Sequence, residues 1–144
     1  MIYWFTGQPG AGKTTQARLL LEKLKGDTLH IDGDHLRAMS NNKDYSRAGR
    51  EKNVDLAQIM ALSAHAEGYT VVISLVAPYK SQREMLKAFM DGAMVEIYVH
   101  TTETRGREKF HTEYEPPLEN FIDLDTTGKT PEQSHAELMN LLNL

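Results

Sequence analysis

The sequence predicts an α/β fold, a three-layer sandwich in which helices cover both faces of a central parallel sheet of about five strands. Two observations support it. Short apolar, β-branched runs alternate with helix-like segments about five times along the 144 residues, the usual order of a parallel sheet with crossover helices. A glycine-rich turn, residues 7–12, joins the first run to the first helical segment. This length accommodates one hydrophobic core, so we expect a single domain over residues 1–144.

The first part of the chain predicts two strands and their helices. Ile2–Thr6 is a short apolar run, and Lys13–Lys25 carries leucines at helical spacing until Gly26 ends the pattern. Thr28–Ile31 predicts the second strand, and Asp34–Met39 predicts a short helical turn. The glycine-rich turn therefore lies between a strand and a helix.

A long helix and two further strands follow. Arg47–Glu67 predicts a helix, and Thr70–Leu75 is a continuous β-branched run, as in a strand that is buried on both faces. Ser81–Met90 predicts the next helix, and Met94–Val99 predicts the next strand. The side chains expected on the inner side of the long helix are Val54, Leu56, Ile59, Met60 and Leu62.

The last part of the chain combines a charged segment with a closing helix. About residues 101–118 are rich in charge and contain Gly106 and two prolines, so we expect a loop or lid. Phe121–Leu124 predicts a last short strand. Thr130–Leu142 predicts a helix, because Thr130 begins a capping box that Gln133 completes.

The composition is that of an ordinary globular protein, with 40% hydrophobic and 25% charged residues. The net charge of −4 does not favour broad binding of nucleic acid, although a local basic cleft could hold one phosphate-bearing ligand. The absence of cysteine excludes disulfides and a thiol nucleophile. No apolar run is long enough for a membrane span, and the N-terminus lacks the basic region of a signal peptide. We expect a cytoplasmic protein.

The glycine-rich turn fits the phosphate-binding motif GxxxxGK[ST] over residues 7–14. Its glycines let backbone N–H groups wrap a phosphate at the positive end of the following helix. Lys13 supplies a cation for the β- and γ-phosphates, and Thr14 offers a hydroxyl to Mg²⁺. The sequence therefore predicts a nucleoside-triphosphate site in a P-loop NTPase fold. Ligands of parallel sheets lie at the carboxyl ends of the strands, so the loops expected to line the site are 7–14, 32–37, 76–83 and 101–117.

A small-molecule kinase fits this pattern better than a GTPase or a motor ATPase. A guanine-reading motif is expected after a late strand, whereas the similar letters of Asn41–Asp44 precede the third strand. A motor ATPase needs a strand that ends in an acidic residue, whereas the third strand ends at Ser74 and Leu75.

Two interpretations, one functional and one structural, are open for several polar residues near the second strand. Asp32 and Asp34 either hold Mg²⁺ waters and accept the proton of an attacking hydroxyl, or form a turn in which Asp34 caps the next helix. Arg37 lies one turn beyond Asp34 and reaches the same cleft. Arg50 and Asn53, one turn apart on the long helix, either hold a phosphate or sulfate oxyanion or are solvated helix residues.

Five segments in order, within residues 4–124, resemble the adenylylsulfate kinase family. They are GQPGAGKTT, HIDGDHLR, YSRAGREKN, SLVAPYKSQR and YEPPLENFIDL. The combination of DGDxxR, [FY]SxxxRxxN and the P-Y pair is more specific than the phosphate loop alone. The resemblance implies an enzyme of sulfate assimilation that uses ATP and Mg²⁺. It would transfer the γ-phosphate to the 3′-hydroxyl of adenosine 5′-phosphosulfate.

The resemblance implies a role for each matching residue. Lys13 and Asp34 would be catalytic, with Asp34 the base for the 3′-hydroxyl, and Thr14 and Asp34 would bind the metal. Tyr45 and Phe110 would stack on the two faces of the acceptor's base. The implied ATP site comprises Gly7, Gln8, Pro9, Gly10, Ala11, Gly12, Lys13, Thr14, Thr15 and Arg107. The implied acceptor site comprises Asp32, Asp34, Arg37, Tyr45, Arg50, Asn53, Val76, Ala77, Pro78, Lys109 and Phe110.

Three departures from the family pattern concern the acceptor. The lid is shorter than is usual in the family and carries residues 110–113, FHTE, in place of an F-T-G turn. Gly49 replaces an aspartate before Arg50, so we expect Arg50 to be held less firmly. Ala77 replaces a serine that is phosphorylated in some members, which leaves direct in-line transfer from ATP.

Two other functions stay open. The first is a kinase of the same fold with a different hydroxyl acceptor: another nucleotide, a nucleoside diphosphate derivative or a modified base in DNA, the one case in which nucleic acid is a partner. The second is a nucleotide-binding module without catalysis, against which the intact Lys13, Thr14 and Asp34 argue. The expected partner is a small-molecule nucleotide acceptor and no membrane. Whether the chain forms a homodimer is left open.

Overall fold

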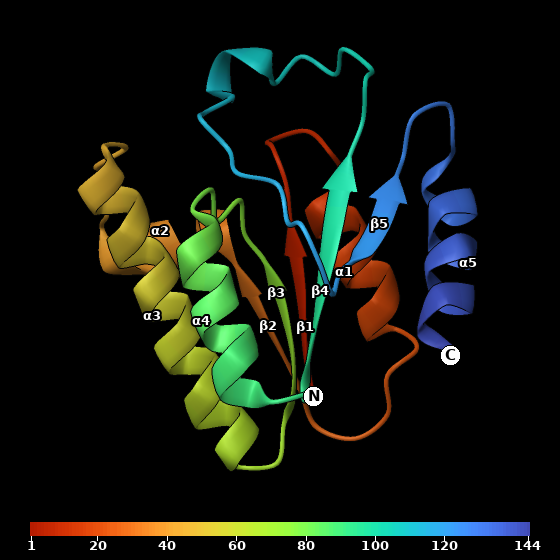
Figure 1. The fold of residues 1–144 in the computed structure, drawn as a ribbon, viewed down its shortest axis with the longest axis horizontal. Coiled ribbons are helices and arrows are strands. Elements are labelled where there is room, and N and C mark those ends of the chain that lie inside the picture. The colour runs from red at the N-terminus through yellow and green to blue at the C-terminus, as the bar shows by residue number, and fades with distance from the viewer.

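The computed structural model describes residues 1–144 and contains five strands and five α-helices. The strands are β1 (Ile2–Thr6), β2 (Thr28–Asp32), β3 (Thr70–Ser74), β4 (Met94–His100) and β5 (Ile122–Asp125). The helices are α1 (Lys13–Leu21), α2 (Gly33–Ser40), α3 (Arg47–Ala66), α4 (Lys80–Met90) and α5 (Pro131–Leu142), with a short 3₁₀ turn η1 (Glu108–Phe110). The strands form one parallel sheet in the order β2-β3-β1-β4-β5 (Figure 1). The predicted α/β fold is confirmed.

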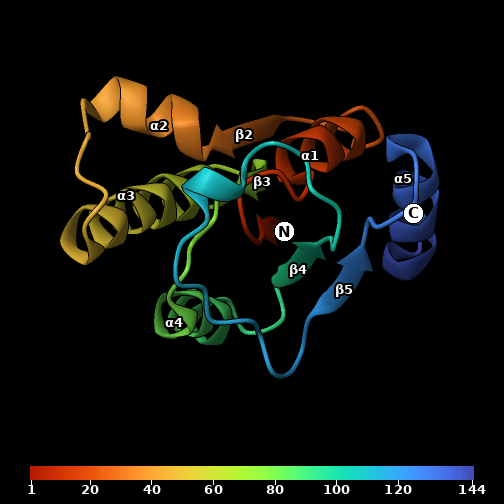
Figure 2. The same ribbon diagram turned by 90° about the horizontal axis from the view of Figure 1, so that it is seen from above.

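The helices cover both faces of the sheet (Figure 2). α1 and α5 pack on one face, whereas α3 and α4 pack on the other, and α2 lies beside β2 and α3. Because all the strands are parallel, their carboxyl ends meet at one edge, and the lid arches over that edge (Figure 1). None of the helices combines the length and apolarity that crossing a bilayer requires.

Two hydrophobic clusters, one on each face of the sheet, form the core. The strand period of two divides β1 between them: Ile2 and Trp4 point into the cluster under α3 and α4, and Phe5 points into the cluster under α1 and α5. All three side chains are fully buried. The central position of β1 in the sheet therefore explains why side chains on both of its faces are buried.

Most element boundaries lie within a residue or two of the prediction. α1 is the main exception, since it ends at Leu21, four residues before the expected Lys25. The capping box of α5 is confirmed: the Thr130 hydroxyl accepts from the Gln133 N–H, and the Gln133 side chain accepts from the Thr130 N–H. The lid carries η1, which the sequence pattern did not predict.

The prediction that Ile59 faces the core is wrong, because its side chain is 63% exposed. The other four predicted residues do face the core: Val54 is buried in the cluster, and Leu56, Met60 and Leu62 pack against it. The buried stripe of α3 includes Asn53, Val54, Ala57 and Ala61. Ala57 and Ala61 are small, so the helix approaches the sheet closely along this stripe. Ile59, two residues from Ala57, points away from it.

A buried ion pair joins α4 to the sheet. Arg83 Nε lies 2.7 Å from Glu96 Oε2, and both side chains are completely buried. Lys87 Nζ lies 2.7 Å from the other carboxylate oxygen. Arg83 also donates to the carbonyl oxygens of Ala77 and Glu115. The guanidinium therefore connects the loop after β3 with the end of the lid.

Replacing Arg83 with methionine should lower the free energy of unfolding by about 3–5 kcal/mol, because Glu96 stays buried with one cation fewer. Arg47 pairs with Glu51 on the surface, so Arg47→Met should cost less than about 1 kcal/mol. Chemical denaturation of both variants measures the difference. Equal losses would contradict the structural role given to Arg83.

Candidate active site

A large cavity lies at the carboxyl edge of the sheet and has a volume of about 830 Å³. The phosphate loop (residues 7–14), the loops after β2 and β3, the start of α3 and the lid all contribute to its wall. It is lined by every side chain that the sequence predicted for the site except Gly7, Gln8 and Ala11. The tertiary fold therefore gathers the predicted residues around one space.

The phosphate loop begins at a position that only glycine fits. Gly7 has a φ of +144°, and a Cβ there would overlap the carbonyl oxygen of Val99 on β4. The loop folds back so that Lys13 Nζ donates to the Gln8 carbonyl at 2.9 Å. Burial lowers the pKa of Lys13 to about 8, against the opposing attraction of Asp34 and Asp32. The site thus holds a buried cation without an anionic partner in direct contact.

Asp32 lies at the centre of a hydrogen-bond network beside α1. Its Oδ1 accepts from Thr14 Oγ1 at 2.9 Å and from Ser74 Oγ at 2.8 Å, and its Oδ2 accepts from the His35 N–H at 3.4 Å. Burial alone would raise the pKa of Asp32, but these hydrogen bonds together hold the pKa below its usual range. Asp32, and not Asp34, is the N-cap of α2.

Asp34 does not cap a helix, and its side chain is exposed in the first turn of α2. It lines the cavity close enough to Lys13 for its charge to oppose the lowering of the Lys13 pKa. Thr14, Asp32 and Asp34 supply a hydroxyl and two carboxylates, the hard oxygen ligands that Mg²⁺ prefers. No group of three or more His, Asp or Glu side chains forms a closed metal cage. The donor set therefore fits a Mg²⁺ ion that is shared with a phosphate ligand.

The loop between α2 and α3 holds two of the predicted acceptor residues together. Arg37 Nη1 donates to the carbonyl oxygens of Asn42 and Asp44, at 3.2 and 3.0 Å. The Arg37 guanidinium lies 4.1 Å from the centre of the Tyr45 ring. The ring is 63% exposed and lines the cavity. Arg37 therefore packs against the ring of Tyr45, which forms part of the cavity wall.

Arg50 and Asn53 form the wall at the start of α3. Arg50 Nη1 donates to the hydroxyl of Thr112 in the lid. Asn53 is 4% exposed, and its buried Oδ1 has no hydrogen-bond partner. Asn53 lines the cavity, so this oxygen is available to a ligand that donates an O–H or N–H. Behind this wall Gly49 lets the preceding loop pack closely on α3, since a Cβ at that position would overlap the Asp44 carbonyl oxygen.

The loop after β3 is held from two sides. Ala77 adopts the left-handed conformation, with a φ of +45°, and its carbonyl oxygen accepts from Arg83. The carbonyl oxygen of Val76 accepts from the Thr6 hydroxyl at 2.7 Å, and that hydroxyl also pairs with the Tyr114 hydroxyl at 2.8 Å. These bonds fix the stretch of residues 76–78 that faces the cavity.

The lid is attached to the phosphate loop by side chains from both. Gln8 Nε2 donates to the Thr112 carbonyl at 2.6 Å, and Gln8 Oε1 accepts from the Thr112 N–H at 3.1 Å. His111 Nε2 lies 3.2 Å from the Pro9 carbonyl oxygen. The amide of Gln8 thus pairs with the lid backbone as a neighbouring strand would.

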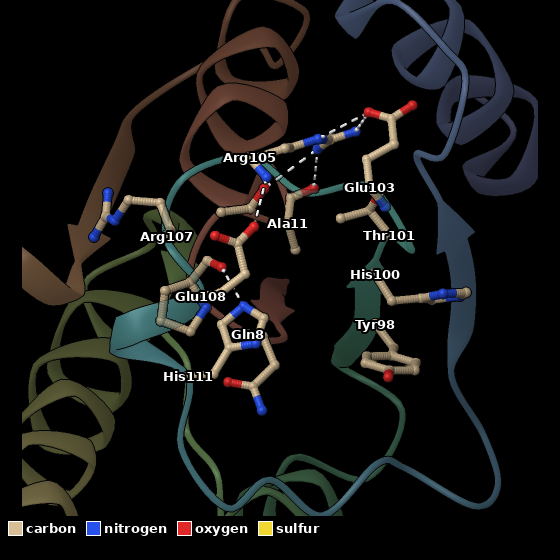
Figure 3. A pocket seen from close by; sticks show the side chains of 12 residues that line it. Gln8, Ala11, Tyr98, His100, Thr101, Glu103, Arg105, Arg107, Glu108 and His111 are labelled. Atoms are coloured by element: carbon tan, nitrogen blue, oxygen red, sulfur yellow. Dashed lines mark hydrogen bonds and ion pairs between the residues drawn. The ribbon is translucent and has the colours of Figure 1, made fainter.

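A second, smaller cavity of about 110 Å³ lies between the phosphate loop and the first half of the lid (Figure 3). Arg105 reaches across it from the lid and donates to the carbonyl oxygens of Gly10 and Ala11, at 3.3 and 3.1 Å. Its other terminal nitrogen donates to Thr126 beyond β5 and pairs with Glu103. Arg105 therefore holds the outer side of the phosphate loop.

The sequence profile described as adenylylsulphate kinase matches residues 1–129. The chain belongs to the adenylylsulphate kinase family. The fold is that of the P-loop NTPases, and family membership places the chain among the kinases, the phosphotransferases with an alcohol group as acceptor.

Three relatives illustrate the match. The bifunctional enzyme NodQ of Rhizobium sp. (strain N33) is 30% identical over 97% of this chain, which spans 23% of NodQ. The adenylyl-sulfate kinase of Buchnera aphidicola is 28% identical over 91% of this chain, which spans 68% of that relative. The structure of the Mycobacterium tuberculosis APS kinase CysC in complex with AMPPNP and APS has a TM-score of 0.78. It is 22% identical and covers 99% of this chain and 97% of its own, and this likeness shows the fold.

Several side chains that line the cavity of this adenylylsulphate kinase family member were not predicted from the sequence. A serine at the end of a strand and an arginine in a charged lid carry no local pattern that marks them. Gln8 was assigned to the nucleotide through its motif, whereas its side chain pairs with the lid. The cavity-lining residues that were not singled out are Gly33, Val54, Ser74, Leu75, Arg105, His111 and Thr112.

Replacing Gln8 with methionine should release the lid, because the side chain loses both hydrogen bonds to Thr112 while keeping its size. We expect the amide of Thr112 to exchange with solvent about tenfold faster, the effect of losing roughly one net hydrogen bond. Hydrogen exchange of the ligand-free protein measures it. Gln82→Met is the matched control, since Gln82 binds α3 and not the lid. Equal lid exchange in both variants would contradict the attachment.

Proposed function

We propose that the chain transfers the γ-phosphoryl group of ATP, with Mg²⁺, to the 3′-hydroxyl of adenosine 5′-phosphosulfate. The observation that carries the proposal is the single cavity that joins the phosphate loop to the wall of Arg50 and Asn53. A donor phosphate and an acceptor hydroxyl would meet within this space, and bringing them together is most of what phosphoryl transfer requires.

The phosphate-loop end of the cavity suits ATP. Lys13 is a buried cation without a contacting carboxylate, and a triphosphate would supply the missing negative charge. The Thr14 hydroxyl donates to Asp32, so its lone pairs are free for a metal ion that bridges the β- and γ-phosphates. Arg107, on the lid side of the cavity, would face the same phosphates. In-line transfer requires no covalent intermediate, and Ala77 offers no hydroxyl for one.

The opposite end of the cavity suits a nucleotide acceptor. The unpartnered Oδ1 of Asn53 calls for a hydroxyl or amino donor, which ribose and adenine both carry. Arg50 offers a cation for the phosphosulfate group. Tyr45 and Phe110, 63% and 52% exposed, are aromatic surfaces on which the base would stack. Lys109 and Pro78 complete this end of the cavity.

Asp34 is the group assigned to the acceptor hydroxyl. It is the exposed carboxylate that lines the cavity on the Lys13 side, and α2 does not use it as a cap. It would orient the 3′-hydroxyl and accept its proton as the new O–P bond forms. The lid covers the carboxyl edge of the sheet, and this supports exclusion of water, which would limit hydrolysis of ATP without acceptor.

The test measures ATP consumption in the presence of Mg²⁺ under three conditions. The first contains adenosine 5′-phosphosulfate, the second contains adenosine 5′-monophosphate as the matched acceptor without sulfate, and the third contains neither nucleotide. A 3′-phosphorylated product from the sulfated nucleotide, identified by mass, supports the proposal. ATP binding without turnover on it contradicts this acceptor. Phosphorylation of a panel of other nucleotides and of modified bases would then show whether the protein transfers the phosphoryl group to a different hydroxyl acceptor. One observation favours that second candidate: Arg37 and Arg50 are both already engaged, by residues 42–44 and by Thr112.

Replacing Asp34 with asparagine should keep the affinity for ATP and lower kcat by about 100-fold or more, the usual contribution of a positioned base. Asp91→Asn is the matched control, because Asp91 is exposed at the end of α4 and lies outside the cavity. Steady-state kinetics with saturating acceptor measures both variants. Unchanged turnover in Asp34→Asn would remove Asp34 from the mechanism.

Binding of ATP should take up a proton above about pH 8. Lys13 in the free protein has a pKa of about 8, because burial lowers it, and a bound triphosphate would raise that pKa again. Affinity should therefore fall as the pH rises from about 7 to 9. Calorimetry in buffers of different ionisation enthalpy measures the uptake. The exposed Lys25→Met variant should behave as the parent, whereas proton uptake by Lys13→Met would refute the assignment.

A further inference from the structure

Four side chains form a continuous hydrogen-bonded row beneath the phosphate loop, and two of them, His30 and Ser74, have no part in the reaction described above. His30 Nε2 lies 2.8 Å from Ser74 Oγ. Ser74 Oγ lies 2.8 Å and Thr14 Oγ1 lies 2.9 Å from the same oxygen of Asp32. The row is built by neighbouring strands, since Asp32 of β2 pairs with Ser74 of β3 in the sheet register.

The direction of each bond in the row follows from the chemistry of its members. An ionised carboxylate only accepts, so both hydroxyls donate to Asp32. A hydroxyl carries one hydrogen, so Ser74, having donated it, accepts from His30. The proton of the neutral His30 ring must therefore be on Nε2. By the same argument Thr14 points its hydrogen at Asp32 and its lone pairs elsewhere.

We propose that His30 is a positioning residue: its Nε2–H holds Ser74, and Ser74 holds Asp32 so that the Thr14 hydroxyl presents its lone pairs to Mg²⁺ on the bound nucleotide. This proposal depends on one part of the proposed function, namely that the cavity binds a nucleotide together with Mg²⁺. Ser74 is 2% exposed, so solvent does not replace His30 as the donor. Without that donor Ser74 is free to rotate, and Asp32 loses one of its three bonds.

The position of the His30 proton is tested on the unmodified protein. A long-range ¹H–¹⁵N spectrum of the histidine side chains, without ligand at neutral pH, reports which ring nitrogen carries hydrogen. A proton on Nε2 supports the proposal. A neutral ring with its proton on Nδ1 overturns it, because Ser74 would then have no donor. This measurement needs no variant to fold and no substrate to bind.

The effect on the metal is tested by the affinity for AMPPNP with and without Mg²⁺. His30→Leu removes the donor and should lower the Mg²⁺-dependent gain in affinity about tenfold, the usual effect of losing an outer hydrogen bond at a metal site. Affinity without Mg²⁺ should stay the same. His30→Gln, which keeps an N–H donor, should recover most of the gain, and His65→Leu on α3 is the matched control.

A double-mutant cycle shows whether the effect runs through Ser74. Ser74→Ala should lower the Mg²⁺-dependent gain by itself, and His30→Leu should then add little. An unchanged gain in His30→Leu, or a full additional loss in the Ser74→Ala background, overturns the proposal. A parent protein that binds AMPPNP equally with and without Mg²⁺ contradicts the proposed function and the role of His30 together. Failure of adenosine 5′-phosphosulfate as acceptor contradicts the choice of acceptor and leaves His30 in place.

Discussion

The close passage of the phosphate loop over the neighbouring strand constrains the rest of the site. Gly7 follows the central strand β1 and lies so close to the carbonyl oxygen of Val99 that no side chain fits there. That passage turns the chain into α1, so that the start of the helix, Lys13 and Thr14 face the carboxyl edge of the sheet. Because β1 lies between β3 and β4, the loops after β2 and β3 and the lid after β4 border the same space. Sheet order therefore determines which residues can meet a ligand.

The two buried cations Arg83 and Lys13 differ in how far the surrounding protein balances their charge. Arg83 has Glu96 and two carbonyl oxygens as partners, so its charge is balanced within the fold and serves to connect α4, the loop after β3 and the lid. Lys13 contacts only the carbonyl of Gln8, and burial lowers its pKa to about 8. The fold thus leaves one cation without an anionic partner in direct contact where a phosphate would bind, which makes the site receptive to an anion.

The part of the cavity wall that contains Tyr45, Arg50 and Asn53 is built by loops that interlock. Gly49 makes room for Asp44, the loop of residues 42–44 accepts from Arg37, and Arg37 supports the Tyr45 ring. The absence of a side chain at Gly49 therefore permits the close packing of this loop on α3. The lid closes over the same wall through Thr112, which contacts Arg50 on one side and Gln8 on the other. These contacts involve Gly49 and Thr112, two positions at which the chain departs from the family pattern.

Much of the fold and the outline of the site could be predicted from the sequence, because they depend on short-range patterns. Hydrophobic period, glycine stops and the phosphate motif each lie within a few consecutive residues, and the strands, the phosphate loop and the capping box of α5 follow from them. Ser74 beside Asp32, Gln8 against Thr112 and the outward side of Ile59 depend instead on strand register, lid path and the closeness of α3 to the sheet. Those contacts join residues far apart in the chain, and no local pattern encodes them. The sequence by itself determined which chemical groups are present and in what order, whereas tertiary structure decided which of them touch.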